Sequence, residues 1–251
     1  MIDRNYRILI TRSKDRSASL IKACEVQGIQ AYAIPLTEQK LTESANSTPE
    51  LSKYKWVIFT SVIAVNITAG ALKLDLTKFA DEVKFAVVGK ATGVAVTNSF
   101  KLPDIIAEPS SSNGLARTII QKVLPDECGD ILWICAENPV TDLQNILTSK
   151  GFNIDSWQVY RTLNRNSTLV SRELEITKPW DAIFFAAPSS VNAYSLLAED
   201  IDEINCIAIG ETTAEALANK KCKRITVCAS TETADIVSAF FKSIGQTVSS
   251  E

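Results

Sequence analysis

Several hydroxyl side chains follow apolar runs that end in glycine, and this pattern could bind an anion. One run ends at Gly210 and is followed by Thr212 and Thr213; an earlier run reaches Gly89 and is followed by Thr92. Each pattern indicates a strand, a tight turn and a helix that a threonine could cap. Backbone N–H groups at such a turn, with the positive end of the helix dipole, favour an anionic ligand at the carboxyl edge of a sheet.

Other polar side chains occupy similar positions, and each has two interpretations. Ser61, Ser189 and Ser190 follow apolar runs that begin at a tryptophan, and they can cap helices or contact a ligand. Arg12 follows the first apolar run and can bind a carboxylate or remain a solvated charge. Tyr160, at the end of an expected strand, can be catalytic or a half-buried aromatic residue with its hydroxyl in water. On residue type alone, the second interpretation of Tyr160 is favoured.

The composition excludes several kinds of chemistry. The chain of 251 residues contains no histidine, which removes histidine-dependent catalysis and the commoner zinc sites. Its six cysteines form no CxxC pair, so we expect reduced structural thiols. No GxGxxG motif follows a strand. We therefore expect no metal and no cofactor.

Charge and hydropathy limit the partners and the location. A net charge of −3 argues against general binding to nucleic acid or to an anionic membrane. No window approaches 18 consecutive apolar residues, and the first residues pass directly from charged side chains into an expected strand. We expect a cytoplasmic protein, or a plastid protein whose transit peptide has been removed.

Four segments recur in the second half of the chain at similar spacing. The pairs are Ile8–Thr11 with Ile131–Ile134, Gly28 with Gly151, Trp56 with Trp180, and Gly89 with Gly210. The separation is 123 positions for the first two pairs and 121 for the last. Agreement among four pairs makes chance similarity of short apolar runs a poor explanation, so the sequence predicts two similar domains.

The order of these elements predicts the architecture. Strands are expected at 8–11, 30–36, 56–60, 104–107, 130–135, 153–160 and 224–228, with helices between them. A polar linker followed by a short amphipathic segment is expected at 37–53, and a second linker with a helix at 161–178. This alternation indicates an α/β fold with parallel sheets flanked by helices. One domain is inserted into the other: 1–36 with 163–251 form domain 1, and 37–162 form domain 2. We expect two antiparallel connecting strands and a ligand site in the cleft between the domains.

The chain resembles the uroporphyrinogen-III synthase family over nearly its whole length. The motifs that carry the resemblance are ILITR from Ile8, FTSVIAV from Phe59, VVGKAT around Val88, VYRT from Val159, FFAAPSSV from Phe184 and AIGETTAEAL from Ala208. The resemblance implies two α/β domains joined by a pair of strands. It also implies a cofactor-free enzyme that closes hydroxymethylbilane, a linear tetrapyrrole, and inverts its ring D to give uroporphyrinogen III.

The resemblance also assigns roles to individual residues. Tyr160 matches a family tyrosine proposed to assist departure of the substrate hydroxyl, and Thr92 and Thr213 match threonines that face the cleft. The sequence also departs from the family pattern. Pro139 and Val140 stand where bacterial members often have glycine and arginine, Val62 stands where proline is common, and Ala187 stands where serine is usual.

The implied partners are the substrate hydroxymethylbilane and, transiently, hydroxymethylbilane synthase, and the protein is expected to be a monomer. The alternative is a non-catalytic binding or sensor protein of the same two-domain fold, which the sequence does not separate from an active enzyme.

Overall fold

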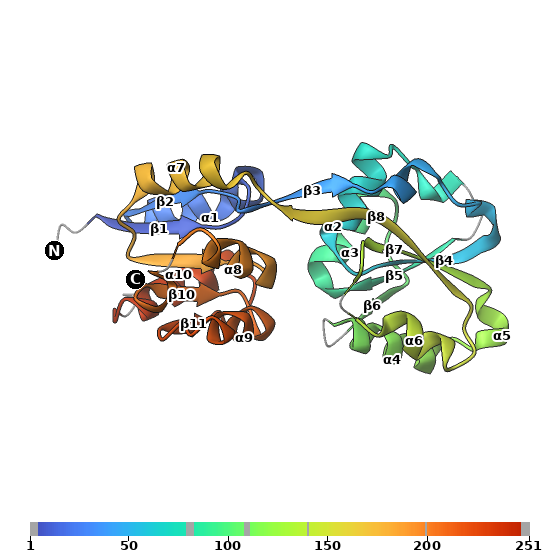
Figure 1. Cartoon of the computed structure of the whole chain (residues 1–251). Coiled ribbons are helices and arrows are strands. Elements are labelled where there is room, and N and C mark those ends of the chain that lie inside the picture. Colours follow the sequence, from blue (N-terminus) through green and yellow to red (C-terminus); the bar gives the residue numbers. More distant parts are fainter. Residues whose placement is uncertain (1–4, 79–82, 108–110, 140, 199, 247–251) are drawn as a thin grey trace. The chain divides into compact units, whose positions relative to one another are not determined.

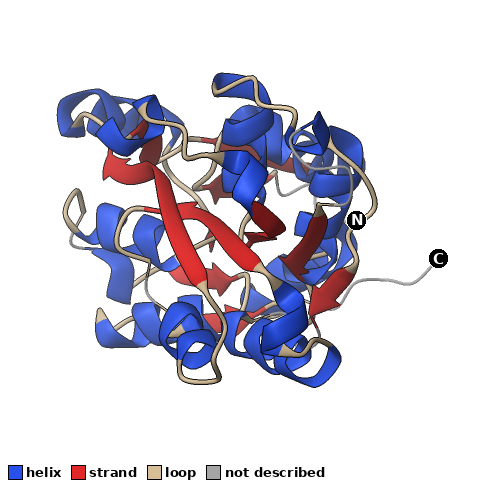
Figure 2. Ribbon diagram, turned by 90° about the vertical axis from the view of Figure 1, so that its right-hand side faces the viewer, coloured by secondary structure: helices blue, strands red, loops and turns tan. Residues whose placement is uncertain are grey.

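The computed structural model describes residues 5–78, 83–107, 111–139, 141–198 and 200–246 (Figure 1). The chain divides into two compact units. Unit 1 comprises Met1–Glu38 and Thr162–Glu251, and unit 2 comprises Gln39–Arg161. Helices surround the strands (Figure 2).

Within its described residues, unit 1 contains one five-stranded sheet with the order β11-β10-β9-β1-β2, in which all neighbours are parallel. The strands are β1 (Tyr6–Ile10), β2 (Ile29–Ala33), β9 (Ala182–Phe185), β10 (Asn205–Ala208) and β11 (Ile225–Val227). The helices are α1 (Lys14–Val26), α7 (Ser167–Thr177), α8 (Pro188–Ser195), α9 (Glu211–Asn219) and α10 (Thr233–Ser243), with a 3₁₀ turn at Asp200–Asp202.

Apolar side chains cover both faces of this sheet because strands between two helical layers are buried on both sides. One face packs against α7, α8 and α9 and includes Leu9, Ile183 and Phe185. The other packs against α1 and α10 and includes Ile8 and Phe184. Successive side chains of each strand point to opposite faces of the sheet, so one short apolar run contributes to both cores.

Unit 2 contains a described sheet with the order β3-β8-β7-β4-β5-β6. Its strands are β3 (Thr37–Leu41), β4 (Tyr54–Phe59), β5 (Lys84–Val88), β6 (Ile105–Ala107), β7 (Asp130–Ala136) and β8 (Ile154–Asn164). Its helices are α2 (Val62–Asn66), continued by a π-helical turn at Ile67–Ala71, α3 (Gly89–Ser99), α4 (Ser112–Lys122), α5 (Pro125–Cys128) and α6 (Leu143–Thr148). Short 3₁₀ turns lie at Glu43–Asn46, Leu51–Lys53 and Leu76–Lys78.

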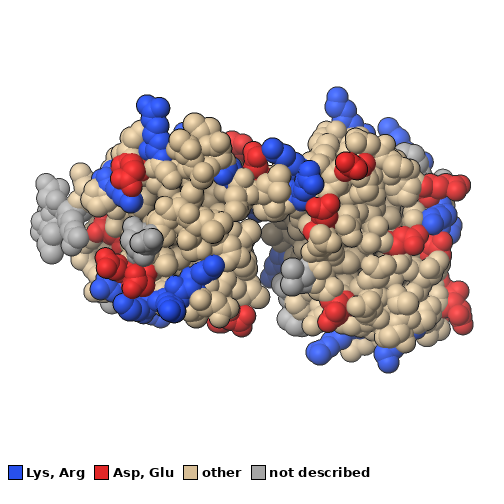
Figure 3. All heavy atoms as spheres, viewed as in Figure 1, with Lys and Arg blue, Asp and Glu red and all other residues tan. Residues whose placement is uncertain are grey.

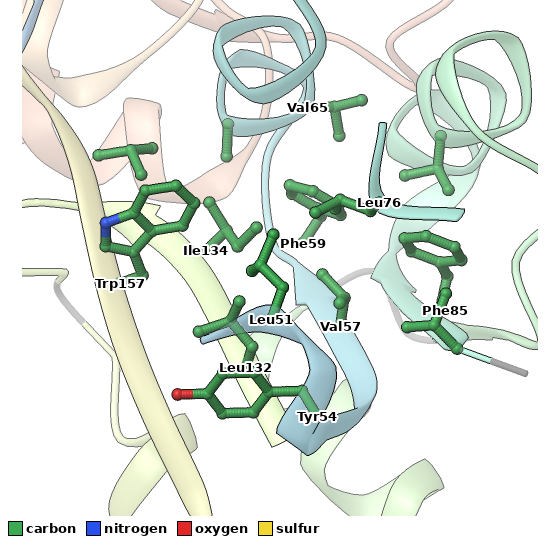
Figure 4. Close-up of a cluster of buried hydrophobic side chains, with 14 of the residues drawn as sticks. Leu51, Tyr54, Val57, Phe59, Val65, Leu76, Phe85, Leu132, Ile134 and Trp157 are labelled. Carbon is green, nitrogen blue, oxygen red and sulfur yellow. The ribbon is translucent and has the colours of Figure 1, made fainter. Parts of the chain in front are cut away.

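The sheet of unit 2 is also buried on both faces. One core lies beneath α2 and α3 and contains Phe59, Phe85 and Trp157 (Figure 4). The other lies beneath α4 and α6 and contains Trp133, which is 1% exposed. The sheets of both units therefore carry apolar side chains on both faces.

The sequence repeat corresponds to equivalent strands in the two sheets. The repeat matches β1 with β7, β2 with β8, β9 with β4 and β10 with β5, and β11 and β6 then occupy the last equivalent place. With this matching, the order β11-β10-β9-β1-β2 becomes β6-β5-β4-β7-β8, which is the order in unit 2. The predicted α/β fold with two similar parallel sheets is confirmed.

Strands β3 and β8 connect the two units. The N–H of Arg165 donates to the carbonyl of Leu36 at 3.0 Å, and that of Thr42 donates to the carbonyl of Val159 at 3.3 Å. From the first of these hydrogen bonds to the second, the residue number rises from 36 to 42 on one strand and falls from 165 to 159 on the other. The two strands therefore run antiparallel, as expected. The structure corrects the two linkers, because β3 begins at Thr37 and β8 continues to Asn164. Polar composition misled here because paired connecting strands need not be buried.

We predict that Gly129→Ala destabilises unit 2. Gly129 follows α5 at φ +68° and ψ −171°, a conformation nearly restricted to glycine, and an added Cβ would lie 2.7 Å from Lys55 Cγ. We expect a loss of about 1–3 kcal/mol, measured by urea unfolding. Gly70→Ala is the matched control, since no atom lies within 4 Å of its added Cβ. Equal unfolding midpoints for the two variants would contradict the prediction.

Candidate active site

The candidate site residues follow the carboxyl ends of neighbouring parallel strands. In unit 2, Ser61 follows β4, Gly89 follows β5 and Tyr160 lies in β8. The pairings of β4 with β5 and β7, and of β7 with β8, bring these strand ends to one sheet edge. In unit 1, Arg12 follows β1 and Gly210 follows β10, again at a shared edge.

Tyr160 and Ser61 form a hydroxyl pair. Their oxygens lie 3.2 Å apart, and either can be the donor. Tyr160 is 5% exposed, so its ring is a core residue. Ser61 caps α2 as predicted, because its Oγ accepts a hydrogen bond from the N–H of Ala64 at 3.2 Å. The cap therefore fixes the serine oxygen that contacts the phenol.

A bulge in β8 determines where Tyr160 points. Cys135 pairs with Gln158, but the next residue, Ala136, pairs with Tyr160, so Val159 is an extra residue. Adjacent residues of a regular strand face opposite sides of the sheet. Because of the bulge, Tyr160 joins the same apolar cluster as Val159, beneath α2 and α3.

The two glycine turns differ in geometry. Gly89 has φ +72°, a value that favours glycine, and α3 begins there. Gly210 has an extended backbone with φ −175°, and its carbonyl accepts from the N–H groups of Thr213 and Ala214, both at 3.1 Å. The first N–H groups of both helices have no acceptor within the helix, which leaves them suited to an anion.

The threonines do not cap these helices, which corrects the sequence prediction. The N-caps are Val88 and Gly210, and neither makes a side-chain cap. Thr92 and Thr213 lie inside the first turn and are 4% and 1% exposed, whereas Thr212 is exposed. Each helix begins before the threonine that was expected to cap it, because α3 starts at Gly89 and α9 starts at Glu211.

Ser189 and Ser190 are not caps either. Ala187 is the N-cap of α8 without a side-chain bond, and Pro188 occupies the first turn. The hydroxyl of Ser190 donates back to the Ala187 carbonyl at 2.7 Å and is buried. Ser189 is half-buried. The equivalent segments of the two units therefore differ. The segment in unit 2 has the capping serine, Ser61, and the segment in unit 1 has a proline, Pro188.

Arg12 is a partly buried cation. Its guanidinium carbon lies 5.5 Å from the centre of the Phe184 ring. Burial, and secondarily the charge of Arg16, lowers the pKa of Arg12. Among the described residues, its Nε has no hydrogen-bond partner although it is buried. An anion at this position would relieve the cost of burying the charge.

Comparison with known proteins shows the family. The family model described as uroporphyrinogen-III synthase HemD matches residues 18–238. The chain belongs to this family.

Two curated relatives are each 27% identical to this HemD-family chain. One is a porphyrin biosynthesis protein HemD from Ruminiclostridium josui, matched over 84% of this chain and 43% of its own length. The other is a chloroplastic uroporphyrinogen-III synthase from Oryza sativa, matched over 83% and 71%. The matched region is thus less than half of the bacterial relative.

Solved structures of similar proteins share the fold of this HemD-family chain. A mutant uroporphyrinogen III synthase from Thermus thermophilus covers 96% of this chain and 99% of its own, at 18% identity and a TM-score of 0.63. A uroporphyrinogen-III synthetase from Helicobacter pylori covers 92% and 96%, at 18% identity and a TM-score of 0.68.

Lys90 is a candidate that the sequence predictions passed over. It is the second residue of α3 and is exposed, whereas the corresponding turn in unit 1 carries Glu211. Comparison of GKAT with GETT across the repeat is the signal that could have identified it. The α3 turn of this HemD-family chain is therefore the more favourable of the two for an anion.

Other features of the HemD-family chain lie apart from these residues. A cavity of about 570 Å³ in unit 1 is bounded by α1, β2 and α7 and contains none of the predicted site residues.

The described residues contain no group of three or more His, Cys, Asp or Glu suited to a metal ion. No helix in the described part of the chain is long and apolar enough to cross a membrane. Acidic and basic side chains are both distributed over the face shown in Figure 3.

We predict opposite stability effects at the two equivalent caps. Ser61→Ala should cost about 0.5–2 kcal/mol because the Ala64 N–H loses its acceptor. Ala187→Ser should stabilise α8 by up to about 1 kcal/mol, since Ala187 has the extended backbone of an N-cap. Thermal unfolding of both variants checks this. A loss of stability in Ala187→Ser would contradict the prediction, because it would show that a serine at this position does not cap α8.

Proposed function

We propose that this chain is a uroporphyrinogen-III synthase, which closes hydroxymethylbilane with loss of water and inversion of ring D. The family match across residues 18–238 is the observation that carries the proposal. The hydroxyl pair and the helix-start turns support it, because they supply a polarised donor and anion-binding groups without a cofactor.

Substrate binding in this proposal rests on backbone groups and a few cations. Hydroxymethylbilane carries eight carboxylates, which the N–H groups at the starts of α3 and α9 can bind without a strongly basic protein. Thr92 and Thr213 lie in the first turns of these helices, and Arg12 offers a partly desolvated charge. Lys90 adds a cation at the α3 turn. Binding of several carboxylates at such groups would restrain a flexible chain, which lowers the entropic barrier to closure.

Tyr160 would act as the acid for the leaving hydroxyl. The pyrrole nitrogen pushes its electron pair toward the hydroxymethyl carbon, and the hydroxyl leaves as water with a proton from the phenol. The resulting azafulvene joins ring D at its substituted carbon, and the spiro intermediate then fragments and recloses. Ser61 would orient the phenol: with its Oγ accepting from Ala64 N–H, its own hydrogen can be donated to the Tyr160 oxygen. A chain of donors in this direction strengthens the last one.

The proposal also includes expectations about oligomeric state, partner and location. They are activity as a monomer, transient contact with hydroxymethylbilane synthase during substrate transfer, and action in the cytoplasm or in a plastid. A binding or sensor protein of the same fold remains the competing class.

The activity is tested with freshly generated hydroxymethylbilane, by resolving uroporphyrinogen isomers I and III. A synthase should give isomer III in excess over the spontaneous isomer I. Isomer I alone, from folded protein that binds the product, would favour the non-catalytic alternative and overturn the proposal.

Tyr160→Phe should reduce turnover while leaving the ring in the core. Loss of a positioned acid typically costs about 10²–10⁴-fold in rate, and less where water substitutes. Tyr54→Phe is the matched control: this tyrosine is 3% exposed and its hydroxyl donates to Asp155 at 2.8 Å, at the start of β4. Wild-type turnover in Tyr160→Phe, with isomer III as the readout, would remove Tyr160 from the catalytic role.

A further inference from the structure

Two cysteines converge beneath α9 in unit 1. Cys206 lies in β10, and Cys222 lies between α9 and β11. The carbonyl of Arg224 accepts from the N–H of Cys206 at 2.8 Å and lies 3.8 Å from the Sγ of Cys222. Both side chains belong to the same core cluster. Because the Arg224 carbonyl contacts both residues, the pair lies close enough to react.

The two thiols differ in access. Cys206 is fully buried, and its sulfur lies 3.8 Å from the carbonyl oxygens of Ile201 and Ile204. Cys222 is 8% exposed, so a small oxidant reaches it first.

The environment of Cys222 also differs from that of the other cysteines. The hydrogen bond from Cys206 lowers the pKa of Cys222 more than burial raises it. By contrast, burial raises the pKa of Cys24 and Cys135 to about 12, and that of Cys128 and Cys228 to about 11. Since the thiolate is the nucleophile, Cys222 combines the partner and the ionisation that oxidation requires.

We propose that Cys222 is a peroxide-reactive thiol and that Cys206 resolves it into an intramolecular disulfide. The Cys222 thiolate attacks one oxygen of a hydroperoxide, the O–O bond breaks, and hydroxide leaves to give the sulfenic acid. The Cys206 sulfur then attacks the Cys222 sulfur, and the sulfenic oxygen leaves as water with the thiol proton. The peroxide is reduced, and the two cysteines lose two electrons in total.

The bond would close a loop that contains the Gly210 turn and all of α9. This loop carries Thr212 and Thr213, so oxidation would tie together both ends of one proposed anion-binding turn. The disulfide itself does not depend on the proposed activity, because it follows from the thiol contacts alone.

The test treats the folded full chain with hydrogen peroxide, blocks remaining thiols with N-ethylmaleimide under denaturing conditions, and maps peptides without reduction. We expect two of the six thiols to be lost and a Cys206–Cys222 cross-linked peptide to appear. In a separate measurement, N-ethylmaleimide should modify Cys222 in the folded chain at least about tenfold faster than Cys135.

Variants assign the order of the steps. Cys206→Ala should leave a Cys222 sulfenic acid that dimedone traps, while Cys222→Ala should keep its five thiols. Cys135→Ser, at another buried cysteine, should still form the cross-link. Circular dichroism checks that each variant is folded. A different disulfide, or wild-type protein that retains all six thiols at peroxide doses that oxidise free cysteine, would overturn the proposal.

Discussion

Parallel pairing of strands that are apolar on both faces is the constraint on which the rest of the structure depends. In such a sheet every strand ends at the same edge, so the residues that follow separate strands become neighbours. Ser61 and Tyr160 are 99 residues apart in the chain, yet their oxygens are 3.2 Å apart. The apolar cores on both faces stabilise this edge, and the ring of Tyr160 is part of one of them.

The duplicated fold carries two unequal versions of the same edge. The unit 2 copy retains a capping serine and a cationic turn, with Ser61 and Lys90. The unit 1 copy has Ala187 at the equivalent cap and Glu211 in the turn, and it adds the partly buried Arg12. The repeat thus supplies two sets of backbone N–H groups, while side-chain chemistry is concentrated in unit 2.

The hydroxyl pair shows how local and long-range structure combine at the site. Ser61 is held by its own helix, because its Oγ accepts a hydrogen bond from the N–H of Ala64, three residues further along the chain. Tyr160 is held by packing on the core and by the bulge that turns it toward that core. The phenol is therefore oriented by burial and the serine by a backbone hydrogen bond, so neither needs a charged partner.

The sequence by itself determined the α/β class, the duplicated strand order, the positions of most helices and the hydroxyl residues that follow the strands. These follow from apolar periodicity and glycine turns, which are local properties of the chain. The capping role of Ser61 was also readable, because an N-cap depends on residues within one turn. Only the tertiary structure decided that Thr92, Thr213 and Ser190 lie inside first turns, that β8 continues through a polar segment, and that Cys206 and Cys222 share one core cluster. Each of these depends on a neighbouring strand or helix whose register the sequence does not encode locally. The bulge at Val159 is the clearest case, since one extra residue opposite β7 reverses the face that Tyr160 occupies.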